Sequence, residues 1–294
     1  MRARQPRIHG CRCGWSVCGC SAAGSLPAGL GTVNCDPVII LFFADVVGKP
    51  GREALIERLP GLREQFHADV VVANGENVTE GRGIKPAHAE ALLTAGVDVI
   101  TTGNHIWKLR ETYRYLDQQE RILRPYNFLK SNPGRGLTVV ESAAGRLGVI
   151  NLCGSLYLCP ARSPFEAVTE ALEHLHGLRN ILVDFHAEAT SEKVAMGWFL
   201  AGQVSAVIGT HTHVRTADAC VLPGGTAYIT DAGMCGSRDS VIGVKKDLVL
   251  ERFLTQLPVR FEVAEGDVWL EGVVIELGSE GRAVRIEPFE IAAS

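Results

Sequence analysis

Side chains of the kinds that bind divalent cations recur along this chain in short motifs that contain or adjoin glycine. They offer carboxylate, carboxamide and imidazole groups rather than thiolates. Such ligands suit borderline or hard divalent metals such as manganese, iron or zinc. The candidate ligands are Asp45, Glu76, Asn77, Asn104, His186, His211 and His213.

The stretch before each motif has the pattern of a β-strand. Short apolar runs that are rich in β-branched residues and bounded by turn signals predict strands buried on both faces. The predicted strands are 38–43, 69–73, 97–101, 180–184 and 205–208. Where strands alternate with helices, their carboxyl ends lie along one edge of the sheet, and side chains from distant segments meet there. The sequence therefore predicts a metal-dependent active site at that edge.

Segments with charge on one side separate these strands and predict helices. Pro86 and Pro164 stand where the first turn of a helix tolerates a missing N–H group, and Ser163 can cap the helix that follows it. The predicted helices are 51–66, 86–95, 109–119, 165–176 and 190–202. The body of the chain is thus predicted to be α/β.

The last third of the chain is richer in strands, which are joined by turns that contain glycine. The predicted strands here are 226–230, 260–263, 268–277 and 283–288. We expect them to form a second sheet that packs on the first. The predicted fold class is therefore α/β, a two-sheet sandwich flanked by helices in a four-layer α-β-β-α arrangement.

Length and composition favour one catalytic domain over residues 37–294. The chain has 294 residues with 46% hydrophobic content, which allows a sizeable core, and it contains no long linker or internal repeat. Its formal charge of −4 gives no basic footprint, so we expect neither a stable complex with nucleic acid nor a membrane partner. Bound cations would instead supply the positive charge that a small phosphodiester substrate requires.

Residues 1–36 differ from the rest of the chain. They hold five of the nine cysteines and lack hydrophobic periodicity. We predict a disordered extension, with a zinc knuckle as the alternative, since structural zinc sites usually use wider Cys pairs. No apolar segment typical of a secretory signal follows the arginines. The remaining cysteines are scattered and indicate no disulfide framework, which favours a cytoplasmic protein.

Several motifs along the chain resemble those of one known family. They are DVVGKPGR (45–52), NGEN (74–77), GRGI (81–84), GNHIW (103–107), DFHAEATSEK (184–193), GTHTHV (209–214) and TDAGMCG (230–236). These motifs occur in the family's order between about residues 38 and 290. The chain therefore resembles the YmdB-like family of calcineurin-like metallophosphoesterases.

The resemblance implies a dinuclear metal phosphodiesterase. In the wider superfamily the first motif is Asp-x-His and the second is Gly-Asp-x-x-Asp, and this chain departs from both. By the resemblance, Glu76 bridges the two metals and Asn77 takes the ligand position of the missing His. Asp45 and His213 complete the first metal site. The ligands of the second metal are Asn104, His186 and His211.

The resemblance also bears on substrate and assembly. It points to 2′,3′-cyclic nucleotides or related phosphodiesters as substrates and to a homo-oligomer, for which exposed apolar strands in 226–290 could supply a self-complementary patch. We expect two divalent ions as cofactors, iron or manganese, with zinc or magnesium as the alternatives. Two such ions can clamp a phosphate ester and activate a water molecule for attack.

His105 is adjacent to a candidate ligand, yet its predicted role is different. Neighbouring residues at a strand end point in different directions, so His105 can face the substrate while Asn104 faces the metal. An imidazole can protonate a leaving alkoxide near neutral pH, and we predict that His105 is the general acid. His211 and His213 are two positions apart, so in an extended chain both imidazoles would point to one face.

Structural roles are the alternatives for several of these residues. A single His after a strand, such as His186, is more often structural than a ligand, and Asn77 could serve a turn. Asp184 and Glu188 are expected to support the ligands rather than bind the metal. The alternative functions are a phosphoprotein or phosphomonoester phosphatase and a non-catalytic, metal-stabilised regulatory protein. The presence of His105, which metal binding does not require, argues against the second of these.

Other charged residues have less specific predictions. Arg82 and Lys193 either neutralise substrate phosphate or lie at the surface. Several histidines occur in the extension or on polar helix faces and are expected to be solvated. They are His9, His67, His88, His174 and His176.

Overall fold

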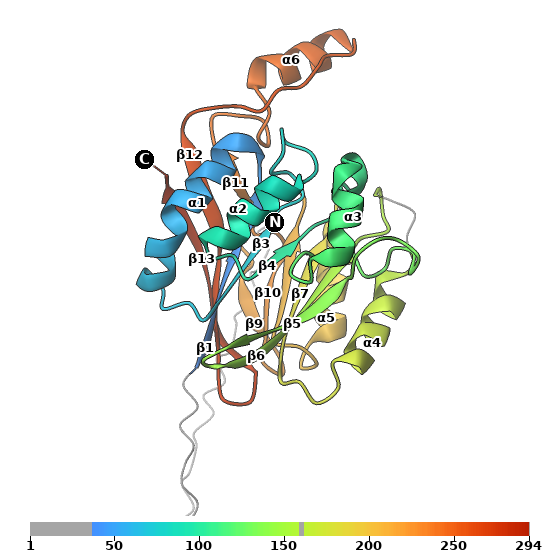
Figure 1. The fold of residues 1–294 in the computed structure, drawn as a ribbon, viewed down its shortest axis with the longest axis vertical. Helices are drawn as coiled ribbons and strands as arrows, with labels where there is room; N and C mark the ends of the chain where they lie inside the picture. Colours follow the sequence, from blue (N-terminus) through green and yellow to red (C-terminus); the bar gives the residue numbers. More distant parts are fainter. Residues whose placement is uncertain (1–36, 159–161, 294) are drawn as a thin grey trace, which may run out of the picture. The chain divides into compact units, whose positions relative to one another are not determined.

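The computed structural model describes residues 37–158 and 162–293 of the chain. Within them, two β-sheets pack face to face, and helices cover the outer face of each sheet (Figure 1). The predicted four-layer α-β-β-α arrangement is therefore confirmed. The extension predicted for residues 1–36 lies outside the described residues.

The first sheet has the strand order β2-β11-β12-β1-β3-β4, and β13 pairs with β12. Within it, β1 runs parallel to β3 and antiparallel to β12. Its strands are β1 (Val38–Phe43), β2 (Asp45–Val46), β3 (Val70–Asn74), β4 (Val99–Thr101), β11 (Met234–Ser237), β12 (Val268–Leu277) and β13 (Ala283–Ala292).

The second sheet has the strand order β5-β6-β7-β8-β10-β9. Its central strands β6, β7, β8 and β10 are parallel. The strands are β5 (Leu137–Ser142), β6 (Gly145–Cys153), β7 (Asn180–His186), β8 (Ala206–Thr210), β9 (Cys220–Leu222) and β10 (Thr226–Ile229).

Strand β1 shows how the apolar residues divide between two cores. Ile40 and Phe42 pack into the core between the sheets. Leu41 and Phe43 point the other way, into the core beneath the helices of the first sheet. Because successive side chains of a strand face opposite sides, a strand buried on both faces appears in the sequence as an unbroken apolar run.

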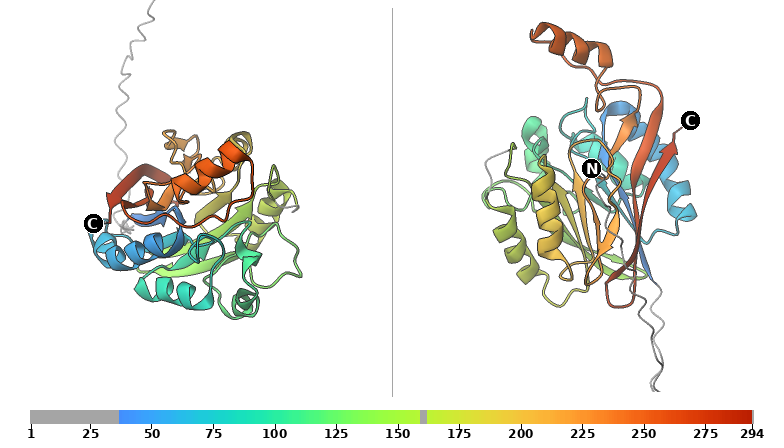
Figure 2. Two further views of the ribbon diagram at one scale, coloured as in Figure 1. Left: turned by 90° about the horizontal axis from the view of Figure 1, so that it is seen from above. Right: turned by 180° about the vertical axis from the view of Figure 1, so that it is seen from behind.

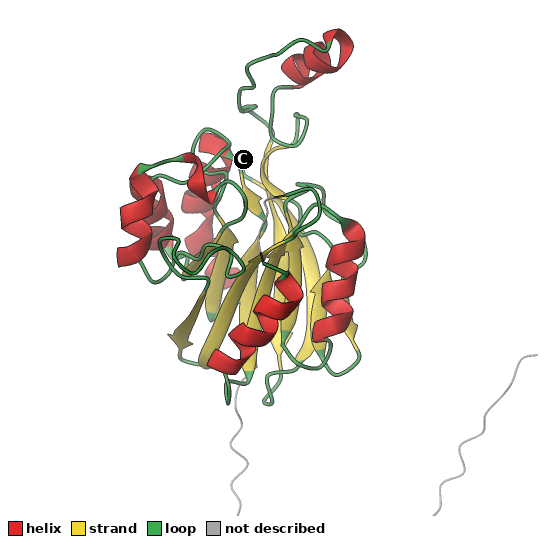
Figure 3. Cartoon of the chain, turned by 90° about the vertical axis from the view of Figure 1, so that its right-hand side faces the viewer, coloured by secondary structure: helices red, strands yellow, loops and turns green. Residues whose placement is uncertain are grey.

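Every helix predicted from the sequence is present, with ends that lie close to those expected. They are α1 (Gly48–Gln65), α2 (Pro86–Ala95), α3 (Glu111–Gln118), α4 (Pro164–His174) and α5 (Thr190–Leu200). Ser163 caps α4, since its side chain accepts a hydrogen bond from the backbone N–H of Glu166 at 3.4 Å. Helices α1 and α2 cover the first sheet and α4 and α5 cover the second, and Figure 3 shows helices on both sides of the strands.

The prediction for the last third of the chain is wrong in two respects. Strands β12 and β13 join the first sheet and β10 joins the second, so this region does not form a sheet of its own. Residues 260–263 form no strand, and Val263 makes only an isolated bridge to Val244. Apolar alternation identifies a strand, but long-range pairing selects its neighbours, and here β12 takes the place beside β1. The hairpin of β5 and β6 was not predicted either.

Residues 240–267, which we call the α6 excursion, leave the first sheet between β11 and β12. They carry α6 (Lys246–Thr255), a helix that the sequence did not predict and that projects beyond the ends of the strands (Figures 1 and 2). Val249 is the only buried residue of α6. Leu250, Phe253 and Leu254 are exposed. The exposed apolar surface expected on strands in 226–290 therefore includes a patch on a helix.

Within residues 37–158 and 162–293, no helix combines the length and the apolar character that crossing a membrane requires.

Candidate metal centre

The candidate ligands lie where strands of both sheets end. Asn74, His186 and Thr210 are the last residues of β3, β7 and β8. The motifs that follow these strands emerge at one edge of the sandwich, as the alternation of strands and helices predicts. The first sheet supplies Asp45, Glu76, Asn77 and Asn104, and the second supplies His186, His211 and His213.

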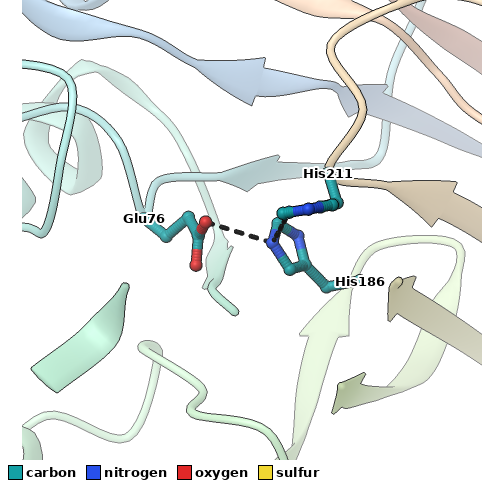
Figure 4. A group of neighbouring side chains, drawn as sticks. All are labelled: Glu76, His186 and His211. Carbon is teal, nitrogen blue, oxygen red and sulfur yellow. Dashed lines mark hydrogen bonds and ion pairs between the residues drawn. The ribbon is translucent and has the colours of Figure 1, made fainter. Parts of the chain in front are cut away.

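One group of side chains, which we call the His186 group, consists of Asn104, His186 and His211. Atom Nε2 of His186 lies 3.0 Å from Nδ1 of His211 and 3.2 Å from Oδ1 of Asn104. The same atom lies 3.0 Å from Oε1 of Glu76 (Figure 4). The donor atoms of Glu76, His186 and His211 all lie within 4.8 Å of one another. This clustering of carboxylate and imidazole donors fits a divalent metal.

A second group, the His213 group, consists of Asp45, Asn77 and His213. Atom Nδ2 of Asn77 lies 3.4 Å from Oδ1 of Asp45 and 3.2 Å from Nε2 of His213. The same nitrogen lies 3.5 Å from Oε1 of Glu76. Glu76 therefore touches both groups with one carboxylate oxygen.

The side-chain amide of Asn77 faces the His213 group with its nitrogen in this structure. Rotating the amide by half a turn exchanges nitrogen and oxygen at almost no cost in shape. The oxygen then lies between Asp45 and His213, and the nitrogen lies next to His105. In this orientation Asn77 can serve as a metal ligand together with its neighbours.

The two carboxylates of the centre are ionised although they are fully buried. Burial alone would raise the pKa of Asp45, but the hydrogen bond and charge of His213 outweigh it and lower the pKa. Burial also opposes ionisation of Glu76, yet His186 and His105 hold its pKa well below the usual range. Two buried negative charges are thus available for cations.

The two histidines of the His186 group differ in protonation. Burial would lower the pKa of His186, but the carboxylates of Glu76 and Asp45 raise it to about 9. Burial, followed by the charge on His186, lowers the pKa of His211 to about 3. At neutral pH the imidazole of His186 in the metal-free centre carries a second ring proton and is charged, whereas that of His211 carries only one and is neutral. A cation that binds His186 must therefore displace this proton.

Hydrogen bonds on the side of the ring away from the centre fix the orientation of His186. The hydroxyl of Thr210 donates to Oδ1 of Asp184 at 2.7 Å, so it can only accept from Nδ1 of His186, which lies 3.0 Å away. Asn74 donates to the other oxygen of Asp184 at 3.1 Å. Burial raises the pKa of Asp184 to about 6. With its proton on Nδ1, neutral His186 presents the lone pair of Nε2 to the centre.

Gly103 makes room for this imidazole. A Cβ atom at position 103 would lie 2.0 Å from Cδ2 of His186, so any other residue would collide with the ring. The glycine of the GNHIW motif is thus explained by the close approach of His186.

The two histidines of the GTHTHV motif reach the centre through an unexpected backbone. His211 has φ +103° and His213 has φ +61°, both in a region that residues other than glycine rarely adopt. The condition that the chain stays extended from His211 to His213 is therefore not met. The two rings lie in the same centre because the chain turns sharply at each of them. Such strain persists only where the surroundings hold it, and it is frequent at functional sites.

His105 lies beside the centre with one ring nitrogen toward it. Its Nδ1 lies 2.7 Å from Oδ1 of Asn77 and 3.2 Å from Oε1 of Glu76. Its backbone N–H donates to Oε2 of Glu76 at 2.9 Å. Among the described residues, Nε2 of His105 has no hydrogen-bond partner, and the side chain is 25% exposed. This nitrogen is therefore accessible to a substrate.

Known proteins share much of this sequence and fold. The sequence model of the family described as YmdB-like protein matches residues 41–289. The chain belongs to the YmdB-like family. A Bacillus subtilis (strain 168) relative named 2′,3′-cyclic-nucleotide 2′-phosphodiesterase is 45% identical over 250 residues, which cover 84% of this chain and 95% of the relative.

Two solved structures share the fold of this YmdB-like protein. A hypothetical protein from Thermus thermophilus has a TM-score of 0.82 at 39% identity, over 87% of this chain and 99% of that one. A structure described as a novel phosphatase from Mycoplasma pneumoniae has a TM-score of 0.82 at 35% identity, over 87% and 94% of the two chains. The two-sheet sandwich is therefore of the metallophosphoesterase type.

Two residues of the YmdB-like motifs have a role that the sequence did not reveal. Lys193 is buried, and its ammonium group lies 2.7 Å from Oδ2 of Asp231. The same oxygen accepts hydrogen bonds from the backbone N–H and hydroxyl of Thr212, at 3.1 and 2.7 Å. Lys193 therefore neither lies at the surface nor faces substrate phosphate. The ion pair instead anchors the residue between the two strained histidines.

The other polar residues singled out in the sequence differ in burial and in their contacts. Glu188 reaches Nε2 of His211 at 2.9 Å. Arg82 is exposed. His88 was expected to be solvated, but it is partly buried and lies 2.8 Å from Oγ1 of Thr79, because α2 turns this face toward the 77–85 loop. His67, His174 and His176 are exposed as predicted, and His9 lies outside the described residues.

Proposed function

We propose that this chain is a dinuclear metal-dependent phosphodiesterase that hydrolyses 2′,3′-cyclic nucleotides or related phosphodiesters. Its main support is the meeting of two groups of ligand-type side chains around Glu76, with His105 beside them. The name of the Bacillus subtilis relative supports the substrate class. The whole centre belongs to one catalytic domain, residues 37–294.

Two divalent ions would occupy the centre. The His213 group would hold one ion, the His186 group would hold the other, and Glu76 would contact both. When bound, the ions polarise the phosphate and generate the attacking hydroxide from water. Oxygen and imidazole ligands without thiolate favour iron or manganese, with zinc or magnesium as alternatives.

His105 would act on the leaving group. Its Nδ1 faces Asn77 and Glu76, which fixes the ring, while Nε2 points away from these residues. An alkoxide that departs from phosphorus needs a proton, and Nε2 can supply it. General acid catalysis of this kind contributes about 10²–10⁴-fold to the rate.

A phosphomonoester phosphatase is the second candidate, because one relative of known structure is described as a phosphatase. The same ligands and the same His105 would serve that reaction. The two candidates differ in whether the phosphate carries one ester bond or two, so a direct comparison of substrates separates them.

We expect the protein loaded with manganese or iron to hydrolyse 2′,3′-cyclic AMP with a kcat/KM at least about tenfold above that for nucleoside monophosphates. Cleavage of the bond to the 2′ oxygen would leave the 3′-monophosphate, which chromatography separates from the 2′ isomer. Removing the metals with a chelator should abolish turnover, and adding them back should restore it. Faster hydrolysis of monophosphates would establish the phosphatase, and metal binding without turnover would establish a non-catalytic protein.

We also propose a cytoplasmic homo-oligomer, with α6 as part of the interface. Within the part of the chain that the structure describes, Cys220 and Cys235 form no disulfide, as is usual for cytoplasmic proteins. Helix α6 has 10 residues, and isolated helices shorter than about 12–15 residues are marginal in water. Phe253 and Leu254 are 76% and 82% exposed. A second copy that packs on these residues would both stabilise the helix and bury its apolar face.

The double substitution Phe253→Glu and Leu254→Glu should convert the oligomer to monomer, since it places charges in the middle of the apolar patch. Sedimentation velocity would measure the change in mass. Leu129→Glu is the matched control, because Leu129 is 65% exposed and lies outside the α6 excursion. An unchanged mass for the double variant would exclude α6 from the interface.

A further inference from the structure

Two pockets adjoin the candidate metal centre, and His213 lines both of them. The first, which we call the Phe261 pocket, has a volume of about 200 Å³ and is lined by Asn77, Arg82, His105, His213, Ile242 and Phe261 among others. The second, the Trp269 pocket, has a volume of about 480 Å³, and its lining includes His213, Met234, Arg238, Trp269 and Glu271. Since the phosphate of a substrate must reach the ligands, these two pockets are the candidate sites for the organic part of the ester.

The recognition groups of the Trp269 pocket are already engaged within the protein. The guanidinium of Arg238 lies 3.7 Å from the centre of the Trp269 ring and covers one of its faces. The same guanidinium pairs with Glu271 at 3.4 Å and with Glu290 at 3.0 Å. A ligand that stacked on this face of Trp269 would have to displace an arginine held by two carboxylates.

The Phe261 pocket offers groups that are not engaged. Among the described residues, the ring of Phe261 makes no aromatic or cation–π contact, and the guanidinium of Arg82 has no hydrogen-bond or ion-pair partner. Phe261 is only partly buried, so part of its surface remains accessible. This pocket also borders Asn77 and His105, whereas the Trp269 pocket reaches only His213 of the centre.

The segment directly after Phe261 is paired with residues 243–245. The backbone N–H of Lys245 donates to the carbonyl of Glu262 at 3.0 Å, and that of Ala264 donates to the carbonyl of Gly243 at 2.9 Å. Val244 and Val263 form a bridge between the same two segments. Residues 243–245 and 262–264, the two ends of the α6 excursion, thus pair with each other. This pairing fixes the position of Phe261 beside the centre.

We infer that the Phe261 pocket binds the nucleoside of the substrate, with the base stacked on Phe261 and packed against Ile242. This assignment rests on the proposed cyclic-nucleotide phosphodiesterase function. Stacking on an aromatic ring tolerates any base, since every base has a π face. Arg82 and Glu80, which also line the pocket, supply donors and acceptors for ribose hydroxyls and base edges. Phe261 is therefore a specificity-determining residue that favours nucleotides over smaller diesters.

The test compares two cyclic diesters, 2′,3′-cyclic AMP and glycerol 1,2-cyclic phosphate, which lacks a base. Phe261→Ala should lower kcat/KM for 2′,3′-cyclic AMP by about 5- to 100-fold, mainly through a higher KM, as expected for the loss of one stacked base. Its kcat/KM for the glycerol diester should stay near that of the parent protein. Phe261→Tyr, which keeps an aromatic ring, should retain the parent values for both substrates.

Trp269→Ala is the matched control from the other pocket and should change neither substrate. A loss for 2′,3′-cyclic AMP in Trp269→Ala but not in Phe261→Ala would place the base in the Trp269 pocket and overturn the inference. Equal losses for both diesters in Phe261→Ala would give Phe261 a structural role and would also overturn it. If the parent protein hydrolyses both diesters and Phe261→Ala changes neither, this inference fails while the proposed function stands. If the metal-loaded parent hydrolyses neither, both fail.

Discussion

Glu76→Ala should lose both bound metals and the phosphodiesterase activity together. Oxygen Oε1 of Glu76 lies 3.0 Å from His186 and 3.5 Å from the amide of Asn77, so this carboxylate touches both ligand groups. Without it, two cations held close together would repel each other with no shared negative charge between them. Elemental analysis of the purified variant and assay of 2′,3′-cyclic AMP hydrolysis measure the two losses, and hydrolysis should fall to the background rate.

Two further variants keep this experiment interpretable. Glu76→Gln retains an acceptor for the backbone N–H of His105, so it should fold like the parent and still lose the metals. Glu192→Gln is the matched control, because Glu192 is also a buried carboxylate but bonds the backbone of Ser155 and Leu156 instead of a candidate ligand. Retention of both metals by Glu76→Ala would show that another residue bridges them.

His105→Ala should keep both metals yet hydrolyse 2′,3′-cyclic AMP about 10²–10⁴-fold more slowly, the range expected when a general acid is removed. The defect should shrink with bis-nitrophenyl phosphate, because nitrophenolate needs little protonation as it leaves. The ring contacts the centre only through Nδ1, and Nε2 has no partner among the residues that the structure describes. Parallel kinetics on the two diesters, together with metal analysis, measure both parts of this expectation.

Asn104, the neighbour of His105, is expected to bind metal rather than to donate a proton. Oδ1 of Asn104 lies 3.2 Å from Nε2 of His186, within the His186 group. Asn104→Ala should therefore weaken binding of the second metal and slow both diesters alike. Equal defects of His105→Ala on both diesters would assign His105 to phosphate positioning, and loss of a metal from this variant would make it a ligand.

The position of the centre could be predicted because strand ends are visible in the sequence. Buried parallel strands appear as apolar runs, and the residues after them, such as Glu76 after β3 and His211 after β8, must emerge at one edge. The helices were predicted for a similar reason, since Pro86 and Ser163 mark where two of them begin. Local sequence was sufficient for these features.

Features that depend on distant contacts could not be predicted. The positive φ angles of His211 and His213 are held by neighbours such as the Lys193–Asp231 pair, and no local pattern encodes that pair. Lysine is usually exposed, so the sequence alone gives no sign that Lys193 is buried in the folded protein. Helix α6 was not predicted. Several of its apolar residues are exposed, so the order of apolar and polar residues along it does not reflect packing against the rest of the domain.

The origin of the ligands in two different sheets has a mechanical consequence. Glu76 follows β3 of the first sheet and His186 ends β7 of the second, and these strands are far apart in sequence. A cation held by both residues joins the two layers at their open edge, as a covalent cross-link between distant segments would. Its binding free energy then adds to the free energy of unfolding. The metals would thus stabilise the packing of the two sheets in addition to taking part in catalysis. A lower concentration of available metal would then reduce the stability of the folded protein as well as its activity.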